Sequence, residues 1–277
     1  MRFLIESLRK FGYTTKWMTS GDKKGRSPLI IGSMHGYVKV VELIIREIIN
    51  CTDEEMIKKM YIDFKDFKGR TSLFHAVADG HLSVARLLVE FGADLDIATN
   101  TKHTQPGSTP LMATVERNHL ECFEFLLEQG ANIRAIRQDG ADFLYIAARY
   151  GRREIFERMS ELDEFSFLVN RPTFRRRTVI IPAASHGHIL VCKIILQAMK
   201  NINHRDIDGN TALMYSAIKG NLSSVKWLIS YGANINLKNK SKERALDYAI
   251  YGRHEDVIHF LKKLENKQNK KKVEDQN

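Results

Sequence analysis

A motif of about 33 residues recurs along nearly the whole chain. The clearest copy runs from Gly209-Asn-Thr-Ala-Leu through Gly220-Asn to Gly232-Ala-Asn. Seven copies can be laid in register. The position just before the usual histidine of the motif, as in Gly80-His81, falls at residues 36, 80, 118, 151, 187, 220 and 253. Three of the six intervals between these positions are 33 residues, and the longest is 44. A sustained period of this length indicates stacked repeats, each of which buries its apolar face against its neighbours.

Each copy begins with the signals of a helix start. A residue whose side chain can accept from the free amides of a first helical turn stands before an apolar stretch in six of the copies: Ser27, Thr71, Thr109, Asp142, Thr178 and Thr211. Pro28 and Pro110 follow two of these residues, at a position where a helix tolerates proline. The sequence therefore predicts a first helix in every copy.

The first helix of each copy pairs a large apolar residue with a small residue three positions later. This spacing places both residues on one helical face. The small residues are Gly32, Ala76, Thr114, Ala147, Ala183, Ser216 and Ala249. We expect close helix contacts between neighbouring repeats at all seven positions. A second helix follows, with apolar residues such as Val225 and Leu228 at helical spacing, and ends at glycines such as Gly92 and Gly232.

The pattern of Thr109-Pro-Leu111, Gly80-His81 and Gly92-Ala-Asp94 closely resembles the ankyrin repeat family, and the resemblance covers about residues 22–264. The resemblance implies an all-α helical solenoid with short β-hairpin or loop tips. It also implies a non-catalytic protein-protein interaction module, such as an adaptor or scaffold, that binds its partner on the concave face and the tips. The scaffold serves many partners, so the resemblance does not identify one.

The departures from the period give a domain outline. We expect an N-terminal capping half-repeat over residues 1–21, an array over 22–264 with repeats that start near 22, 66, 104, 137, 173, 206 and 239, and a basic, disordered tail over 265–277. Thr52 and Glu55 form a capping-box pair that predicts an added helix after the first repeat. Residues 98–105 predict an extended tip, and Pro182 predicts a weakened first helix. The chain could equally be a remnant of a longer array.

Composition indicates the environment of the protein. The three cysteines are far apart, which suits a reducing compartment, and Cys122 and Cys192 take positions of buried apolar residues. No signal peptide and no membrane-spanning stretch is visible. We expect a cytoplasmic protein that is monomeric when alone, with the nucleus as an alternative location because of Lys270-Lys271-Lys272.

Two motifs approach known catalytic patterns without matching them. His254 and His259 lie five residues apart, whereas a zinc protease helix needs an interval of four to aim both rings at one metal. Gly21 to Ser27 has the wrong spacing for a phosphate-binding loop and lacks its lysine. No catalytic residue, cofactor or metal is predicted.

The candidate site is a surface with an excess of basic residues, consistent with the formal net charge of +10. Its members are the tip and first-helix residues that the repeat pattern leaves exposed, and arginine and aromatic residues are enriched at binding hot spots. They are Lys23, Lys24, Arg26, Met34, His35, Phe67, Lys68, Arg70, Arg117, Arg149, Tyr150, Phe174, Arg175, Arg176, Arg177, His186, Ile218 and Lys219. The charge favours an acidic protein or peptide. A polyanion such as nucleic acid or an anionic membrane is the alternative, disfavoured by interspersed acids such as Glu116.

Overall fold

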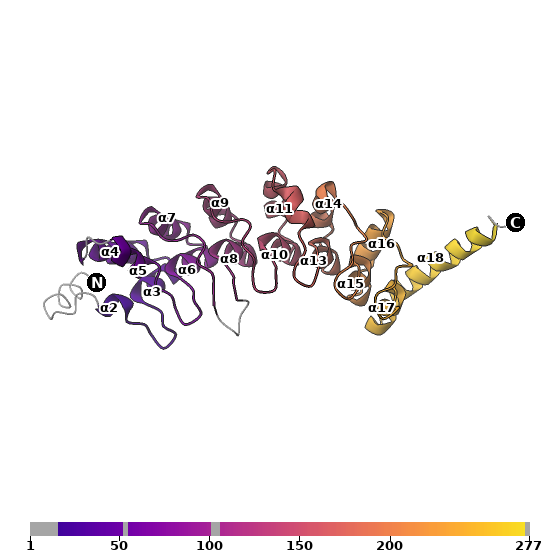
Figure 1. The fold of residues 1–277 in the computed structure, drawn as a ribbon, viewed down its shortest axis with the longest axis horizontal. Helices are drawn as coiled ribbons and strands as arrows, with labels where there is room; N and C mark the ends of the chain where they lie inside the picture. The colour runs from indigo at the N-terminus through magenta and orange to yellow at the C-terminus, as the bar shows by residue number, and fades with distance from the viewer. Residues whose placement is uncertain (1–15, 52–54, 101–105, 275–277) are drawn as a thin grey trace. The chain divides into compact units, whose positions relative to one another are not determined.

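The structure is a computed structural model that describes residues 16–51, 55–100 and 106–274. In these residues all regular secondary structure is helical, as expected, and the tips are turns without strands (Figure 1). The chain divides into two compact units, Met1–Gln138 and Asp139–Asn277. No described helix is long and apolar enough to cross a membrane.

The first unit stacks three helix pairs. Its inner helices pack side by side in one row (Figure 1): α3 (Pro28–Met34), α6 (Ser72–Ala78) and α8 (Pro110–Arg117). Its outer helices form a second row: α4 (Val38–Cys51), α7 (Leu82–Glu90) and α9 (Leu120–Glu128). Two more helices, α2 (Lys16–Thr19) and α5 (Glu55–Ile62), pack on α3 and α4. The added helix is therefore confirmed as α5, while Thr52 lies outside the described residues.

The second unit stacks four pairs in the same way. The inner helices are α10 (Phe143–Tyr150), α13 (Ile180–Ser185), α15 (Ala212–Ile218) and α17 (Ala245–Gly252). The outer helices are α11 (Arg153–Ser160), α14 (Ile189–Ala198), α16 (Leu222–Ser230) and α18 (Glu255–Glu274). A short extra helix, α12 (Phe165–Asn170), follows α11 and packs on α14. It occupies the position where the fourth repeat lacks the usual Gly-Ala-Asp turn.

The predicted caps are present at five of the six positions. The side chains of Ser27, Thr71, Thr109, Asp142 and Thr211 each accept from an amide in the first turn. The prediction for Thr178 is wrong. The Ile181 amide donates to the Thr178 carbonyl at 3.1 Å, and the buried Thr178 hydroxyl has no partner among the described residues. Because α13 begins only at Ile180, Pro182 lies in the first turn, where its missing N–H would have had no acceptor within the helix.

The seven small residues are all buried, as close contacts between helices require. The histidines after the first helices join neighbouring repeats. His81 Nε2 lies 3.0 Å from the Met34 carbonyl, and a Cβ on Gly36 would meet the His81 ring at 2.6 Å. His254 makes the equivalent contact with the Ile218 carbonyl at 3.0 Å, which gives it a structural role.

Three expectations fall at the ends of the array and at the third tip. Residues 1–15 of the predicted capping half-repeat and residues 101–105 of the predicted extended tip lie outside the described residues. Within the described residues, α18 runs to Glu274, through most of the segment expected to form a disordered tail. This segment has neither glycine nor proline and consists mainly of good helix formers, so it extends a helix that the array has already nucleated. Glu265 also lies 2.7 Å from Arg244 Nη1.

Candidate functional site

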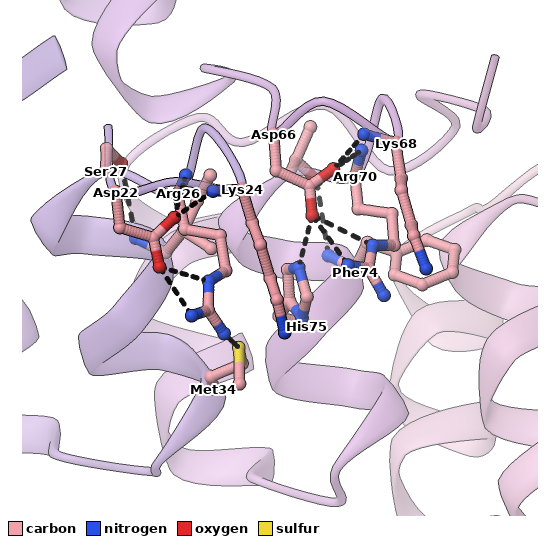
Figure 2. Close-up of polar contacts among 12 residues, drawn as sticks. Asp22, Lys24, Arg26, Ser27, Met34, Asp66, Lys68, Arg70, Phe74 and His75 are labelled. Atoms are coloured by element: carbon pink, nitrogen blue, oxygen red, sulfur yellow. Dashed lines mark hydrogen bonds and ion pairs between the residues drawn. The ribbon is translucent and has the colours of Figure 1, made fainter. Parts of the chain in front are cut away.

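The first two tips of the first unit share one construction (Figure 2). In the second tip, Asp66 Oδ1 accepts from the Lys68 and Arg70 amides at 2.8 and 2.9 Å, while Arg70 Nε donates to Oδ2 of the same carboxylate at 2.9 Å. Asp22 holds the first tip through the Lys24 and Arg26 amides and the Arg26 guanidinium. Each arginine is therefore paired within its own tip, and the turn is fixed before any partner arrives.

Asp66 also joins its tip to α6. His75 Nε2 lies 3.1 Å from Asp66 Oδ2, and both side chains are buried. Burial alone would raise the pKa of Asp66, but hydrogen bonds from His75 and from the Arg70 amide and guanidinium outweigh it and hold that pKa well below its usual range. Asp66 therefore remains an anion that positions the tip over the inner helix.

Phe67 links the two tips. Its amide donates to the Lys24 carbonyl at 3.0 Å. Its ring covers Gly25 so closely that a Cβ at that glycine would lie 2.5 Å from the ring. Gly25 also has a φ of +72°, so both space and backbone conformation require glycine there. The other side of the ring faces solvent, and Phe67 is 74% exposed.

A groove of about 920 Å³ lies between these tips and the inner helices α3, α6 and α8. Eight of the predicted partner-binding residues line it: Lys23, Lys24, Arg26, Met34, Phe67, Lys68, Arg70 and Arg117. Phe74, Ala78 and the buried His75 add apolar and aromatic surface, and Asp79 and Glu116 add two acids. The sequence thus identified half of the lining residues, and the structure brings them together.

The charges of the groove are unevenly paired. Arg26 and Arg70 are bound to Asp22 and Asp66, and Glu116 lies 3.3 Å from the buried Arg137. Four further cations form no ion pair with any described residue, and their side chains are exposed: Lys23, Lys24, Lys68 and Arg117. Asp79 is the one lining acid without an ion pair in the described part of the chain. The groove consequently offers an excess of available positive charge.

Lysine, arginine and acidic side chains beside aromatic ones make up most of the lining of the groove. The described residues contain no cluster of three His, Cys, Asp or Glu side chains that could hold a metal ion. Burial raises the pKa of the Cys122 thiol to about 11 and that of Cys192 to about 12, which disfavours the reactive thiolate at neutral pH.

The remaining predicted residues lie elsewhere. His35 follows α3, and its ring stacks on Tyr37 with centroids 5.5 Å apart. Arg149, Tyr150, His186, Ile218 and Lys219 lie at the ends of the neighbouring inner helices α10, α13 and α15 of the second unit. Phe174 is an exposed tip residue whose ring lies against Gly140, as Phe67 lies against Gly25.

The three adjacent arginines in the second unit are not equivalent, which corrects the expectation that all three are exposed. Arg177 is half-buried, and its Nη2 donates to the Tyr215 hydroxyl at 2.6 Å. Arg175 is exposed and lies 3.2 Å from Asp208 Oδ2. Arg176 is exposed and adopts a φ of +59°. Arg177 therefore serves the contact between repeats, and two arginines remain at the surface.

Sequence reasoning missed the carboxylates that organise the tips and their partners on the inner helices, which are Asp22, Asp66, His75, Asp206 and Tyr215. One signal was available. The order Asp-x-x-Gly precedes the cap residue at Asp22, Asp66 and Asp206, and a polar ring stands nine residues after the last two.

A model of the ankyrin repeat family, described as ankyrin repeats in three copies, matches residues 1–99, 97–165 and 180–273. The chain is 29% identical over 241 residues to the ankyrin repeat and KH domain-containing protein mask-1 of Caenorhabditis elegans, a match that covers 76% of this chain and 9% of that protein. It is 26% identical over 282 residues to the ankyrin repeat protein FPV022 of fowlpox virus, covering 85% of this chain and 47% of that protein. The chain thus spans less than half the length of either relative.

A solved structure has the same fold as this chain. The crystal structure of the ankyrin repeat domain of Bcl-3 has a TM-score of 0.65 with this chain at 24% identity, and the match covers 86% of this chain and 99% of that one. At this identity the likeness concerns the fold alone. The family model, by contrast, covers most of the sequence and, within the repeats, leaves out only residues 166–179, where the fifth copy of the motif begins. The chain belongs to the ankyrin repeat family.

Proposed function

We propose that the protein is a non-catalytic adaptor or scaffold that binds an acidic protein or peptide in the groove of its first unit. The observation that carries the proposal is the set of exposed cations without an ion pair among the described residues: Lys23, Lys24, Lys68 and Arg117. An acidic partner would meet these charges in a groove that also offers apolar surface. Such complementarity accelerates association and excludes partners of the wrong charge.

The construction of the tips supports this function. Asp22 and Asp66 fix the turns that carry Lys24 and Lys68, so a partner need not order the backbone on binding. Preorganisation of this kind favours affinity because it lowers the entropic cost of association. The residues at the ends of α10, α13 and α15 give the second unit a separate surface for further contacts.

A polyanion is the alternative partner class. Asp79 and Glu116 line the groove, and an evenly charged polyphosphate backbone would have to pass close to them. A peptide can place neutral residues at these points, whereas nucleic acid carries a phosphate at every step. The acids in the groove therefore favour a protein partner over nucleic acid.

The proposal is tested with a fluorescein-labelled octaglutamate peptide, whose binding is followed by fluorescence anisotropy at increasing salt concentration. We expect salt-dependent binding that weakens at least fivefold in a Lys24→Glu/Lys68→Glu variant. A Lys39→Glu/Lys193→Glu variant is the matched control, because it makes the same change in net charge at exposed positions of the outer helices α4 and α14.

Equal loss in both variants would mean that the peptide senses only net charge, which would contradict the proposal. Tighter binding of a single-stranded DNA oligonucleotide, lost in the Lys24→Glu/Lys68→Glu variant, would favour the polyanion alternative.

We further propose that the protein is monomeric when alone and acts in the cytoplasm or nucleus. The buried, free thiols of Cys122 and Cys192 suit these reducing compartments.

A further inference from the structure

We infer that the groove recognises a specific pattern in its partner: an extended segment in which an aromatic or large aliphatic residue stands two positions from an acidic residue on each side. The inference rests on the proposed function and adds to it the register of the bound segment. Phe67 would contact the apolar residue, and Lys24 and Lys68 would contact the two carboxylates.

The position of Phe67 is the first step of the argument. Its ring packs against Gly25, and its amide donates a hydrogen bond to the Lys24 carbonyl. The ring is therefore positioned before a partner binds. Yet 74% of the residue is exposed, more than any other large hydrophobic residue in the described part of the chain. A rigid aromatic ring in a groove is a favourable anchor, since little side-chain entropy is lost when a partner covers it.

The charges beside the ring are the second step. Lys68 follows Phe67 in the chain, Lys24 supplies the carbonyl that accepts from the Phe67 amide, and all three residues line the groove. Neither ammonium group has an ion pair with a described residue. The arginines of the same tips, Arg26 and Arg70, are already bound to Asp22 and Asp66. The two lysines are therefore the cations that remain available next to the ring.

The distance between the two tips that carry Lys24 and Lys68 follows from the packing of neighbouring repeats. The tips stand on neighbouring inner helices, and packed helices lie about 8–10 Å apart. In an extended peptide the side chains of residues i, i+2 and i+4 share a face, and the outer two are about 13 Å apart. Flexible lysine stems can cover the difference of a few ångströms. A segment of the form acidic-x-apolar-x-acidic thus places all three side chains on the groove at once.

Two peptides of equal composition test the pattern. One is fluorescein-Gly-Glu-Ser-Phe-Ser-Glu-Gly, and the other carries the same residues in the order Gly-Glu-Glu-Ser-Ser-Phe-Gly. We expect the patterned peptide to bind the full chain about three- to tenfold more tightly, the range that one aromatic contact contributes. Phe67→Ala should abolish this preference, and Phe67→Tyr should retain it.

Phe174→Ala is the matched control, because Phe174 is also an exposed tip residue seated on a glycine but belongs to the second unit. It should leave the preference unchanged. Melting temperatures of the variants establish that each is folded. Equal affinity of the two peptides, or a preference that survives Phe67→Ala, would overturn the inference. If both peptides still lose affinity in the Lys24→Glu/Lys68→Glu variant, the proposed function stands while the pattern fails. The absence of any salt-dependent binding would overturn both.

Discussion

Arg177 Nε lies 3.5 Å from Oδ2 of Asp206, a carboxylate that belongs to the next repeat of the second unit. In the first unit, Arg26 and Arg70 bind the aspartate of their own tips. The fifth repeat has Thr173 where those tips have aspartate, so its arginine reaches the neighbouring repeat instead. One substitution in the tip thus converts a contact within a repeat into a contact between repeats.

Arg177→Ala should lower the free energy of unfolding of the second unit by about 1–3 kcal/mol at pH 7. The reason is that Asp206 has a fully buried side chain, and its Oδ2 would keep only the Tyr215 hydroxyl as a partner among the described residues. Urea denaturation measures the change. Arg175→Ala is the control, because the exposed pair with Asp208 should contribute less than about 1 kcal/mol. Similar losses in the two variants would show that Arg177 does not join the repeats.

Asp142→Asn should stabilise the protein at pH 7 but not at pH 4. Burial raises the pKa of Asp142 from 3.8 to about 6, outweighing the Tyr145 amide that donates to its side chain. Because the folded-state pKa is raised, the contribution of Asp142 to stability is present below about pH 4 and lost as pH rises through about 6. Asparagine still provides a capping oxygen without the buried charge.

The expected gain from Asp142→Asn is about 1–3 kcal/mol at pH 7, a range set by a shift of about two pKa units. Melting temperatures of both proteins between pH 4 and pH 7 provide the measurement. A difference between them that stays constant over this range would mean that Asp142 does not titrate as described.

Ala147→Leu should destabilise the second unit by about 1–3 kcal/mol through overpacking, since Ala147 is fully buried in the first helix of its repeat. Gln138→Leu, at an exposed tip position, should be nearly silent. Thermal unfolding of the two variants compares a buried position with a tip position. Equal shifts in melting temperature would contradict the register of the repeats.

Truncation after Leu264 should lower the free energy of unfolding by up to about 1 kcal/mol, because it removes Glu265 from its pair with Arg244 at 2.7 Å. Truncation after Gln268 retains this pair and is the control. Melting temperatures distinguish the two. If both shortened chains melt like the full chain, the contact between Glu265 and Arg244 contributes nothing to stability.

The sequence was sufficient to predict the parts of the fold that each repeat determines locally. The caps at Thr71 and Thr211 and the glycine-terminated second helices depend on neighbours within a few residues. The buried Ala147 and Ala183 were predictable because the same small position recurs in every repeat. Thr178 shows the limit of this reasoning. Its hydroxyl is a good cap by type, but the helix begins two residues later.

The pairing of the charges could not be predicted in the same way. Whether an arginine is available to a partner depends on which residue stands at the tip, four positions before it or in the next repeat. Arg175, Arg176 and Arg177 are adjacent in the sequence, yet only Arg177 is half-buried, between Tyr215 and Asp206 of the following repeat. In the groove, Asp22 and Asp66 form ion pairs with the arginines of their tips and leave the lysines unpaired, and this choice of partner is not visible in the sequence.

The most direct test of the proposed function locates an acidic peptide on the protein. Octaglutamate is titrated into the ¹⁵N-labelled full chain, and the amide chemical shifts are followed. We expect the largest saturable changes at Lys24, Phe67, Lys68 and Arg117 in the groove, with small ones at Lys238 and Lys240, exposed lysines at a tip of the second unit. Changes of equal size at both sets, or changes confined to the second unit, would contradict an acidic-partner site in the groove.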